Sequence, residues 1–244
     1  MSLPTGAGTP FPEFAEAYTQ ATAECRAVRT MSASLSLSGR AGAAKLGARI
    51  DAGLAEPARL RLEGFPRVHF GGQPFFVLVS RDSDATLVLT RDRRVLRGAS
   101  PAAIVEALTG IAVDPAELRA IVSGCGFGAV QPAEGRSFGN GWAAAEPQGV
   151  MTFLRQMGGL WRVVAARRGP LTLEYGDLAP RPATVRLHTS ASLGVVGAEL
   201  TVRISQVEIN VPFADAVFEA PVPRDAVPLT LEELRSAGPL GQGS

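Results

Sequence analysis

The chain has 244 residues and a net charge of +1, with 46% hydrophobic and 19% charged residues. This composition is typical of a folded globular protein and excludes a disordered chain. The basic residues are dispersed without an aromatic stripe, which argues against a nucleic-acid partner, and no apolar run is long enough to predict a membrane-spanning helix.

The first ten residues are rich in Gly, Pro and Thr and predict a flexible tether, 1–10. They lack the basic start and the apolar run of a signal peptide. Two interpretations stay open: a cytosolic protein, or a chain that starts after a removed export signal. Residues 11–29 then place Phe11, Phe14, Tyr18 and Cys25 on one face, which predicts an N-terminal helix.

From Thr30 the apolar period changes from about 3.6 to 2, the period of β-strands. The first strand, 31–39, places Met31, Ala33, Leu35 and Leu37 on one face and four serines on the other. Five more segments with tight connections follow, so an antiparallel meander of six strands is expected, each with one dry and one wet face. The five segments are 43–54, 58–64, 74–80, 85–91 and 93–98.

A helical passage interrupts the strands at about 100–124. Ser100 and Pro101 are an N-cap and a first-turn proline, and Asp114 with Pro115 repeats this pair after Gly110. The Gly-rich residues 126–147 that follow predict a long connecting loop.

The period of 2 returns in five segments: 150–156, 160–168, 170–176, 183–190 and 195–211. In the last segment the apolar parity slips near Gln206, which predicts a β-bulge. Residues 229–236 predict a short terminal helix. One domain over 11–244, mainly β with about eleven strands, is the economical count.

Cys25 and Cys125 are 100 residues apart, and neither lies in a metal-binding pattern. Free buried thiols are the favoured interpretation, and one long-range disulfide is the alternative. The only histidines, His69 and His188, have no ligand-type neighbours in sequence, so neither a metal nor another cofactor is expected.

A hydrolase is the one catalytic alternative in the sequence. Gly135–Gly139 satisfies GxSxG, and Ser137, Asp177 and His188 follow in the order of a catalytic triad. A nucleophile elbow needs a core strand before the serine and a helix after it, and neither is predicted here. We therefore expect a chance match and no catalytic residue.

Eleven strands with one dry face each present more apolar surface than a few short helices cover. Such a curved sheet either packs solid or encloses an apolar cavity for a ligand. The solid core is favoured for a sheet of this general kind, and the sequence pattern leaves both alternatives open.

The order of elements resembles the LolA/LolB-like lipoprotein-carrier superfamily, and LolB-like outer-membrane lipoproteins in particular. The residues that carry the likeness are MSASLSLSGR, ARLRLEGFP, LVSRDSDATLVLTRDRRVLRG, IVEALTGIAVDPAELRAIVSG and the tail VEINVPFADAVFEAPVP. The resemblance implies an unclosed antiparallel β-barrel with an N-terminal helix and a helical lid, about 100–124, inserted after strand six. It also implies an apolar concave face that holds acyl chains, without catalysis or metal.

The resemblance assigns apolar residues to a cavity, and each of them is equally an ordinary core residue. Its wall would be Leu35, Leu37, Leu46, Ile50, Leu60, Leu62, Phe76 and Leu78, and its lid Ile104, Leu108, Leu118 and Ile121. Phe65 and Phe70, in the loop after the third strand, would contact a membrane or lie against the sheet edge. The serines of 31–39 would line the convex side, beneath the N-terminal helix.

Two hypotheses from different classes follow. The first is a monomeric cell-envelope protein that binds the acyl chains of lipids or lipoproteins, in the periplasm or at the periplasmic face of the outer membrane. Its partners would be a donor carrier protein and the membrane. Many members are lipid-anchored through an N-terminal cysteine that this sequence lacks, which fits a chain trimmed after that residue. The second hypothesis is an envelope scaffold with a packed core and no transported ligand.

Overall fold

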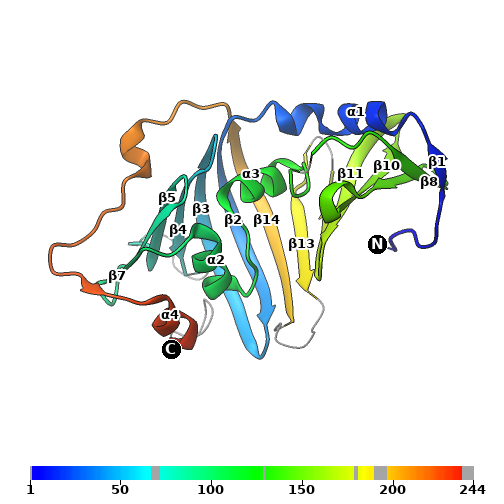
Figure 1. Cartoon of the computed structure of the whole chain (residues 1–244). Coiled ribbons are helices and arrows are strands. Elements are labelled where there is room, and N and C mark those ends of the chain that lie inside the picture. Colours follow the sequence, from blue (N-terminus) through cyan, green and yellow to red (C-terminus); the bar gives the residue numbers. More distant parts are fainter. Residues whose placement is uncertain (1, 67–71, 129, 179–180, 190–196, 238–244) are drawn as a thin grey trace.

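The computed structural model describes residues 2–66, 72–128, 130–178, 181–189 and 197–237. Within these residues one strongly curved sheet forms the body of the protein (Figure 1). Its strands are, in spatial order, β1 (Thr9–Phe11), β8 (Gly135–Gly139), β9 (Trp142–Ala145), β10 (Val150–Met157), β11 (Leu160–Arg168), β12 (Leu171–Gly176), β13 (Thr184–Thr189), β14 (Ala198–Ile209), β2 (Thr30–Ala41), β3 (Ala44–Ala55), β4 (Arg59–Phe65), β5 (Phe76–Arg81), β6 (Asp84–Leu89), β7 (Arg94–Arg97) and β15 (Val227–Pro228).

The sheet is unclosed, because β1 and β15 form two separate edges. Every strand pair is antiparallel except β15 with β7. The expected fold class, a mainly β protein with an unclosed sheet and a helical insertion, is confirmed. The six-strand meander before the insertion is β2 to β7.

The expected number of about eleven strands was too low, since the described residues form a sheet of fifteen. Four short strands were missed: β1, β8, β9 and β15. The loop expected at 126–147 contains two of them as the β8–β9 hairpin. These four strands are too short to show an alternating apolar pattern, and β1 and β15 pair with strands that are distant in sequence. The last residues of the expected tether, Thr9 and Pro10, pair with β8 and belong to the sheet.

Strand β2 shows how the sequence pattern becomes a two-sided sheet. Met31, Ala33, Leu35 and Leu37 are buried, and the serines between them are half-buried on the opposite face. The register of β2 with β14 shifts between Ser205 and Glu208, and Gln206 has a positive φ of 49°. The bulge predicted near Gln206 is therefore confirmed.

Helix α1 (Phe14–Arg26) does not cover the serine face of β2, and that expectation was wrong. It runs along one rim of the sheet (Figure 1), and its buried side belongs to the same apolar cluster as the dry face of β2. Its apolar stripe carries two large aromatic side chains, Phe14 and Tyr18, which are buried beside β8 and β11. Packing there buries more apolar area than packing on the small serine side chains of β2 would.

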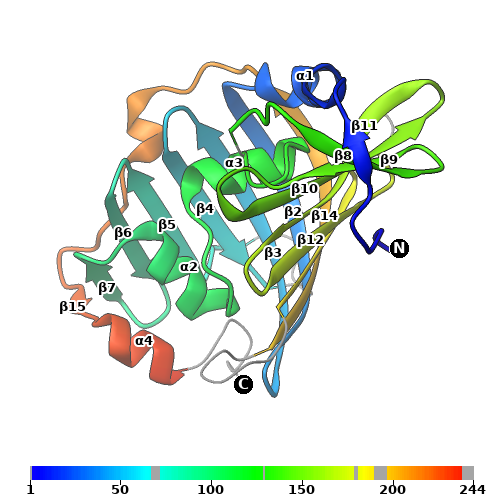
Figure 2. The same cartoon turned by 45° about the vertical axis from the view of Figure 1, so that its right-hand side comes forward.

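Part of the convex side is covered by the C-terminal segment 211–220, which includes a 3-10 turn, Asp215–Phe218. Phe213 and Phe218 pack there on Val77 and Val79 of β5. The guanidinium of Arg61 on β4 donates to the carbonyl oxygens of Val217 and Glu219, at 2.9 and 3.1 Å. The segment continues to β15 and α4 (Leu231–Ala237), so the C-terminus passes around the β7 edge from one side of the sheet to the other (Figure 2).

Candidate functional site

The concave face carries the residues expected as the wall. The side chains of these eight residues lie on β2 to β5, belong to one apolar cluster, and are each at most 8% exposed. They are Leu35, Leu37, Leu46, Ile50, Leu60, Leu62, Phe76 and Leu78. The cluster continues onto β12 to β14 through Leu173, Val185 and Leu200, which the sequence analysis did not single out although they show the same parity signal.

Helices α2 (Pro101–Thr109) and α3 (Pro115–Ser123) lie over this face (Figures 1 and 2). Each begins at a capped proline turn: the Ser100 hydroxyl accepts from the Ala103 N–H, and Asp114 and Glu117 form a capping box. Each ends at a glycine in the left-handed conformation. Ile104, Leu108 and Ile121 are buried in the wall cluster, and Leu118 is half-buried against it.

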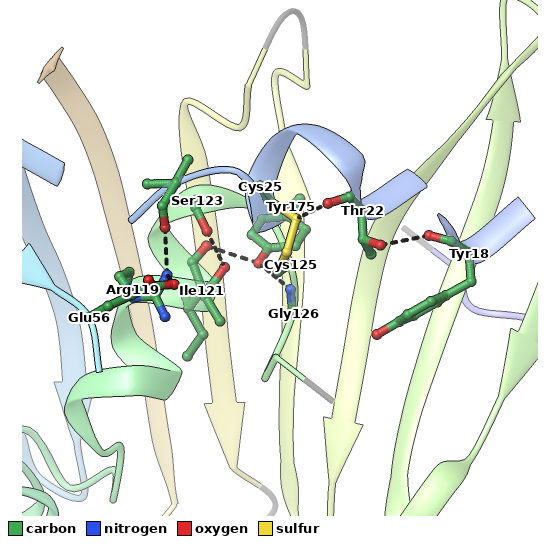
Figure 3. The surroundings of a disulfide bond; sticks show 12 residues. Tyr18, Thr22, Cys25, Glu56, Arg119, Ile121, Ser123, Cys125, Gly126 and Tyr175 are labelled. Carbon is green, nitrogen blue, oxygen red and sulfur yellow. Dashed lines mark hydrogen bonds and ion pairs between the residues drawn. A yellow bond between two sulfur atoms is a disulfide. The ribbon is translucent and has the colours of Figure 1, made fainter. Parts of the chain in front are cut away.

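Helix α3 is fixed to the rest of the protein at several points (Figure 3). A disulfide joins Cys25 of α1 to Cys125, just after α3, with a Cα–Cα distance of 5.6 Å. The favoured interpretation of two free thiols was therefore wrong. The sequence could not decide between free thiols and a disulfide, because the pairing depends on the position of α1 on the rim beside α3.

Tyr175 of β12 provides a second attachment for α3. Its buried hydroxyl donates to the carbonyl oxygen of Ile121 and accepts from the Gly126 N–H, both at 2.9 Å (Figure 3). Burial raises the pKa of this phenol, which keeps the hydroxyl protonated as a donor. No local pattern marks Tyr175, because its two partners lie about 50 residues away in sequence.

Two arginines complete the attachment of α3. Arg119 donates to the carbonyl oxygen of Val28 at 2.6 Å and lies 3.5 Å from the Glu56 carboxylate. Arg168 of β11 donates to the carbonyl oxygen of Ala112 at 3.0 Å, and it also pairs with Glu117. These contacts join α3 and the turn before it to β11 and to the residues that directly follow α1 and β3.

Helix α2 is held differently, by apolar packing and by α4. Its ion pair, Glu106 with Arg235 of α4 at 3.4 Å, has both side chains about half exposed, so it contributes little to stability. Glycines with positive φ flank the helix: Gly98 at 76° and Gly110 at 78°. Of the two lid helices, α2 therefore has the weaker polar attachment.

The space between lid and wall is filled by side chains in this structure, since the lining residues are almost fully buried against one another. An acyl chain can therefore enter only if part of the lid moves. The interior is also free of charge: among the described residues the buried polar side chains are Thr22, Ser80, Ser123, Thr152 and Thr172. A polar hollow of about 950 Å³ lies instead on the outer side of β13 and β14, between Arg40, Arg186 and His188.

The residues expected to contact a membrane are placed only in part. Phe65 ends β4 half-buried, with the Arg49 guanidinium 4.6 Å from the centre of its ring. Phe70 lies outside the described residues. The contact of this loop with a membrane stays a prediction.

The triad candidates are not neighbours in the sheet. Ser137 lies on β8 and His188 on β13, five strands apart in spatial order. Asp177 accepts a hydrogen bond from Thr184, not from His188. In the described part of the chain no group of three His, Cys, Asp or Glu side chains is placed to hold a metal ion, and none of its helices is long and apolar enough to cross a membrane.

No protein-family model and no curated protein sequence matches the chain. The similar solved structures include a DUF1329 family protein from Desulfovibrio piger, with 11% identity, 84% of this chain and 96% of that chain covered, and a TM-score of 0.47. They also include a LolA superfamily protein from Nitrosomonas europaea (10% identity, 88% and 99% covered, TM-score 0.44). A third, from Vibrio parahaemolyticus, is described as an outer membrane lipoprotein-sorting protein domain (10% identity, 84% and 95% covered, TM-score 0.43). All three TM-scores lie below 0.5.

Proposed function

We propose that this protein binds the acyl chains of lipids or lipoproteins between the concave face of its sheet and its lid helices. The observation that carries the proposal is the uncharged apolar interior between a curved sheet and helices that are not part of it. Apolar contact suits an acyl chain, because each buried methylene contributes about 0.8 kcal/mol and needs no hydrogen-bond partner. The sequence resemblance to LolA/LolB-like carriers implies the same class of ligand.

We propose that α2 is the moving part of the lid and that α3 stays in place. The disulfide, Tyr175, Arg119 and Arg168 all hold α3 or the segments next to it. Helix α2 has one exposed ion pair and a positive-φ glycine at each side. Its displacement would expose Ile104 and Leu108 together with the wall, and an acyl chain would replace the contacts that these side chains lose.

A more specific role follows from the resemblance to LolA/LolB-like carriers. The protein would collect acyl chains from a donor carrier or a membrane in the cell envelope and deliver them to or within the outer membrane. The second candidate function is an envelope scaffold with a permanently packed core. The near-complete burial of the wall and lid side chains favours it, since a packed interior needs no ligand.

A cross-link that fixes the lid to the sheet would distinguish acyl-chain binding from the packed scaffold. A Cβ built on Gly110 would lie 3.7 Å from the Cβ of Ala198, a distance at which a disulfide forms, and 3.0 Å from the Cβ of Ala41, which must shift slightly in any variant at this position. We expect Gly110→Cys with Ala198→Cys to fix the end of α2 to β14 and to lower binding of a fluorescent fatty acid at least about tenfold, which corresponds to about 1.4 kcal/mol.

Gly110→Ser with Ala198→Ser is the matched control, because it imposes the same backbone strain without a cross-link, and it should bind like the unaltered protein. Equal binding by the cross-linked and serine variants would contradict the moving lid. If the unaltered protein neither binds the fatty acid nor carries lipid detectable by mass spectrometry after purification, the scaffold function is the correct one.

A further inference from the structure

The outer end of the β10–β11 hairpin carries two large apolar side chains that are about half exposed. Met157 and Leu160 face each other across the turn, and each is 47% exposed, among the largest exposures of big apolar side chains in the described chain. The turn itself is Gly158–Gly159, with φ of 57° and 81°. Figure 2 shows this hairpin extending past α1, away from the lid.

The strand register places further residues on the same face. Side chains alternate along a strand, so the Arg155–Arg162 pair, two residues in from Met157 and Leu160, shares their side of the hairpin. Trp142 of β9 lies opposite Arg155 on the next strand. We call these five residues, Trp142, Arg155, Met157, Leu160 and Arg162, the hairpin-tip cluster.

The hairpin-tip cluster contains two positive charges on one face of the hairpin. Arg155 and Arg162 are directly opposite each other on antiparallel strands, and both side chains are partly exposed. The Arg155 guanidinium lies over the ring of Trp142, 4.9 Å from its centre, which keeps the arginine beside the aromatic ring. Two positive charges beside exposed apolar side chains favour an anionic partner for this surface.

We propose that the hairpin-tip cluster docks the protein on an anionic lipid surface. Two exposed apolar side chains at the end of a hairpin can enter the outer part of the acyl layer, and a tryptophan behind them suits the headgroup level. The two arginines lie where lipid phosphates would be and add electrostatic attraction. The inference rests on the proposed function, because a protein that carries acyl chains must meet a membrane to collect or deliver them.

Tryptophan fluorescence can detect this membrane contact without an added label. Its only two tryptophans are Trp142, in the hairpin-tip cluster, and Trp161, whose ring packs 5.7 Å from that of Phe11 on the inner side. In a Trp161→Phe variant the fluorescence comes from Trp142 alone. We expect vesicles of phosphatidylglycerol and phosphatidylcholine to shift its emission to the blue, and brominated acyl chains to quench it.

The decisive comparison is the partition coefficient of variants of the full chain on the same vesicles. Met157→Ser with Leu160→Ser should lower it at least about tenfold, because the apolar anchor is lost. Arg155→Gln should lower binding to anionic vesicles and reduce its dependence on salt. Val227→Ser is the control: it removes an apolar side chain that is 57% exposed on β15, at the other edge of the sheet, and should change nothing.

Two results would overturn the inference: no partition of the unaltered protein onto anionic vesicles, or equal partition of the Met157→Ser, Leu160→Ser variant. A protein partner would then be the occupant of this surface. Fatty-acid binding in solution, measured on the same variants, should stay unchanged. Vesicle binding without fatty-acid binding would contradict the proposed function and leave the docking surface standing.

Discussion

At the scale of single residues, two buried hydroxyls of the interior differ in their partners. Tyr175 has a donor and an acceptor, whereas the buried Ser80 hydroxyl has no hydrogen-bond partner among the residues that the structure describes. Removing a group from a satisfied buried network leaves its partners unpaired, and removing an unsatisfied hydroxyl does not. The two hydroxyls are therefore expected to contribute differently to stability.

We expect Tyr175→Phe to lower the free energy of unfolding by about 1–3 kcal/mol, because the Gly126 N–H and the Ile121 carbonyl lose their partner. Ser80→Ala is the matched control and should be neutral or slightly stabilising. Denaturant unfolding of both variants measures the difference. A loss for Ser80→Ala as large as that for Tyr175→Phe would show that the two environments are alike after all.

At the scale of elements, α1 and the segment after α3 are joined by the only two cysteines of the chain, 100 residues apart. A bond that closes so long a loop restricts the unfolded chain strongly. It also fixes α1 to the end of the lid that we propose to be static. The disulfide therefore stabilises the folded protein and also holds in place the part of the lid that we propose to be static.

Replacing both cysteines by serine should lower the free energy of unfolding by about 2–5 kcal/mol. The unaltered protein in reductant should show the same loss, and the double variant should not respond to reductant, which makes it the internal control. Fatty-acid binding should survive in the double variant below its unfolding transition, since α2 is the proposed moving part. An oxidised protein no more stable than the double variant would contradict this role of the disulfide.

At the scale of the whole molecule, the C-terminal segment holds one end of the sheet to the lid. Val227 and Pro228 pair with β7, and α4 packs beside α2. A hydrogen bond from Arg94, together with those from the Thr230 N–H and hydroxyl, lowers the pKa of Glu233 from 4.5 to about 2. A carboxylate whose pKa is lowered in the folded state stabilises that state above its unfolded pKa.

The stabilisation from Glu233 should be complete above about pH 4.5 and disappear as the pH falls towards 2. Glu233→Gln should therefore lower the melting temperature at pH 6, and the difference from the unaltered protein should shrink to nothing near pH 2. Glu232→Gln removes the same charge from α4 without touching the Arg94 bond, so it serves as the control. A difference that stays constant between pH 6 and pH 2 would contradict the assignment.

The sequence by itself determined the local structure and the faces of the sheet. The serine and leucine alternation of β2, the parity slip at Gln206 and the capped turns at Ser100 and Asp114 are local signals, and the structure follows each of them. The apolar wall and lid residues could be named because burial follows parity along a strand and spacing along a helix. Their role as a ligand site stays a prediction.

Tertiary structure alone decided what depends on contacts between distant segments. The Cys25–Cys125 bond, the Tyr175 attachment, the short strands at both sheet edges and the position of α1 on the rim each join residues far apart in sequence. The arrangement of Met157, Leu160, Arg155 and Arg162 on one face also depends on the register of a hairpin pair. A local pattern records which side of an element is apolar, but the element that covers that side is chosen by the packing of the complete chain.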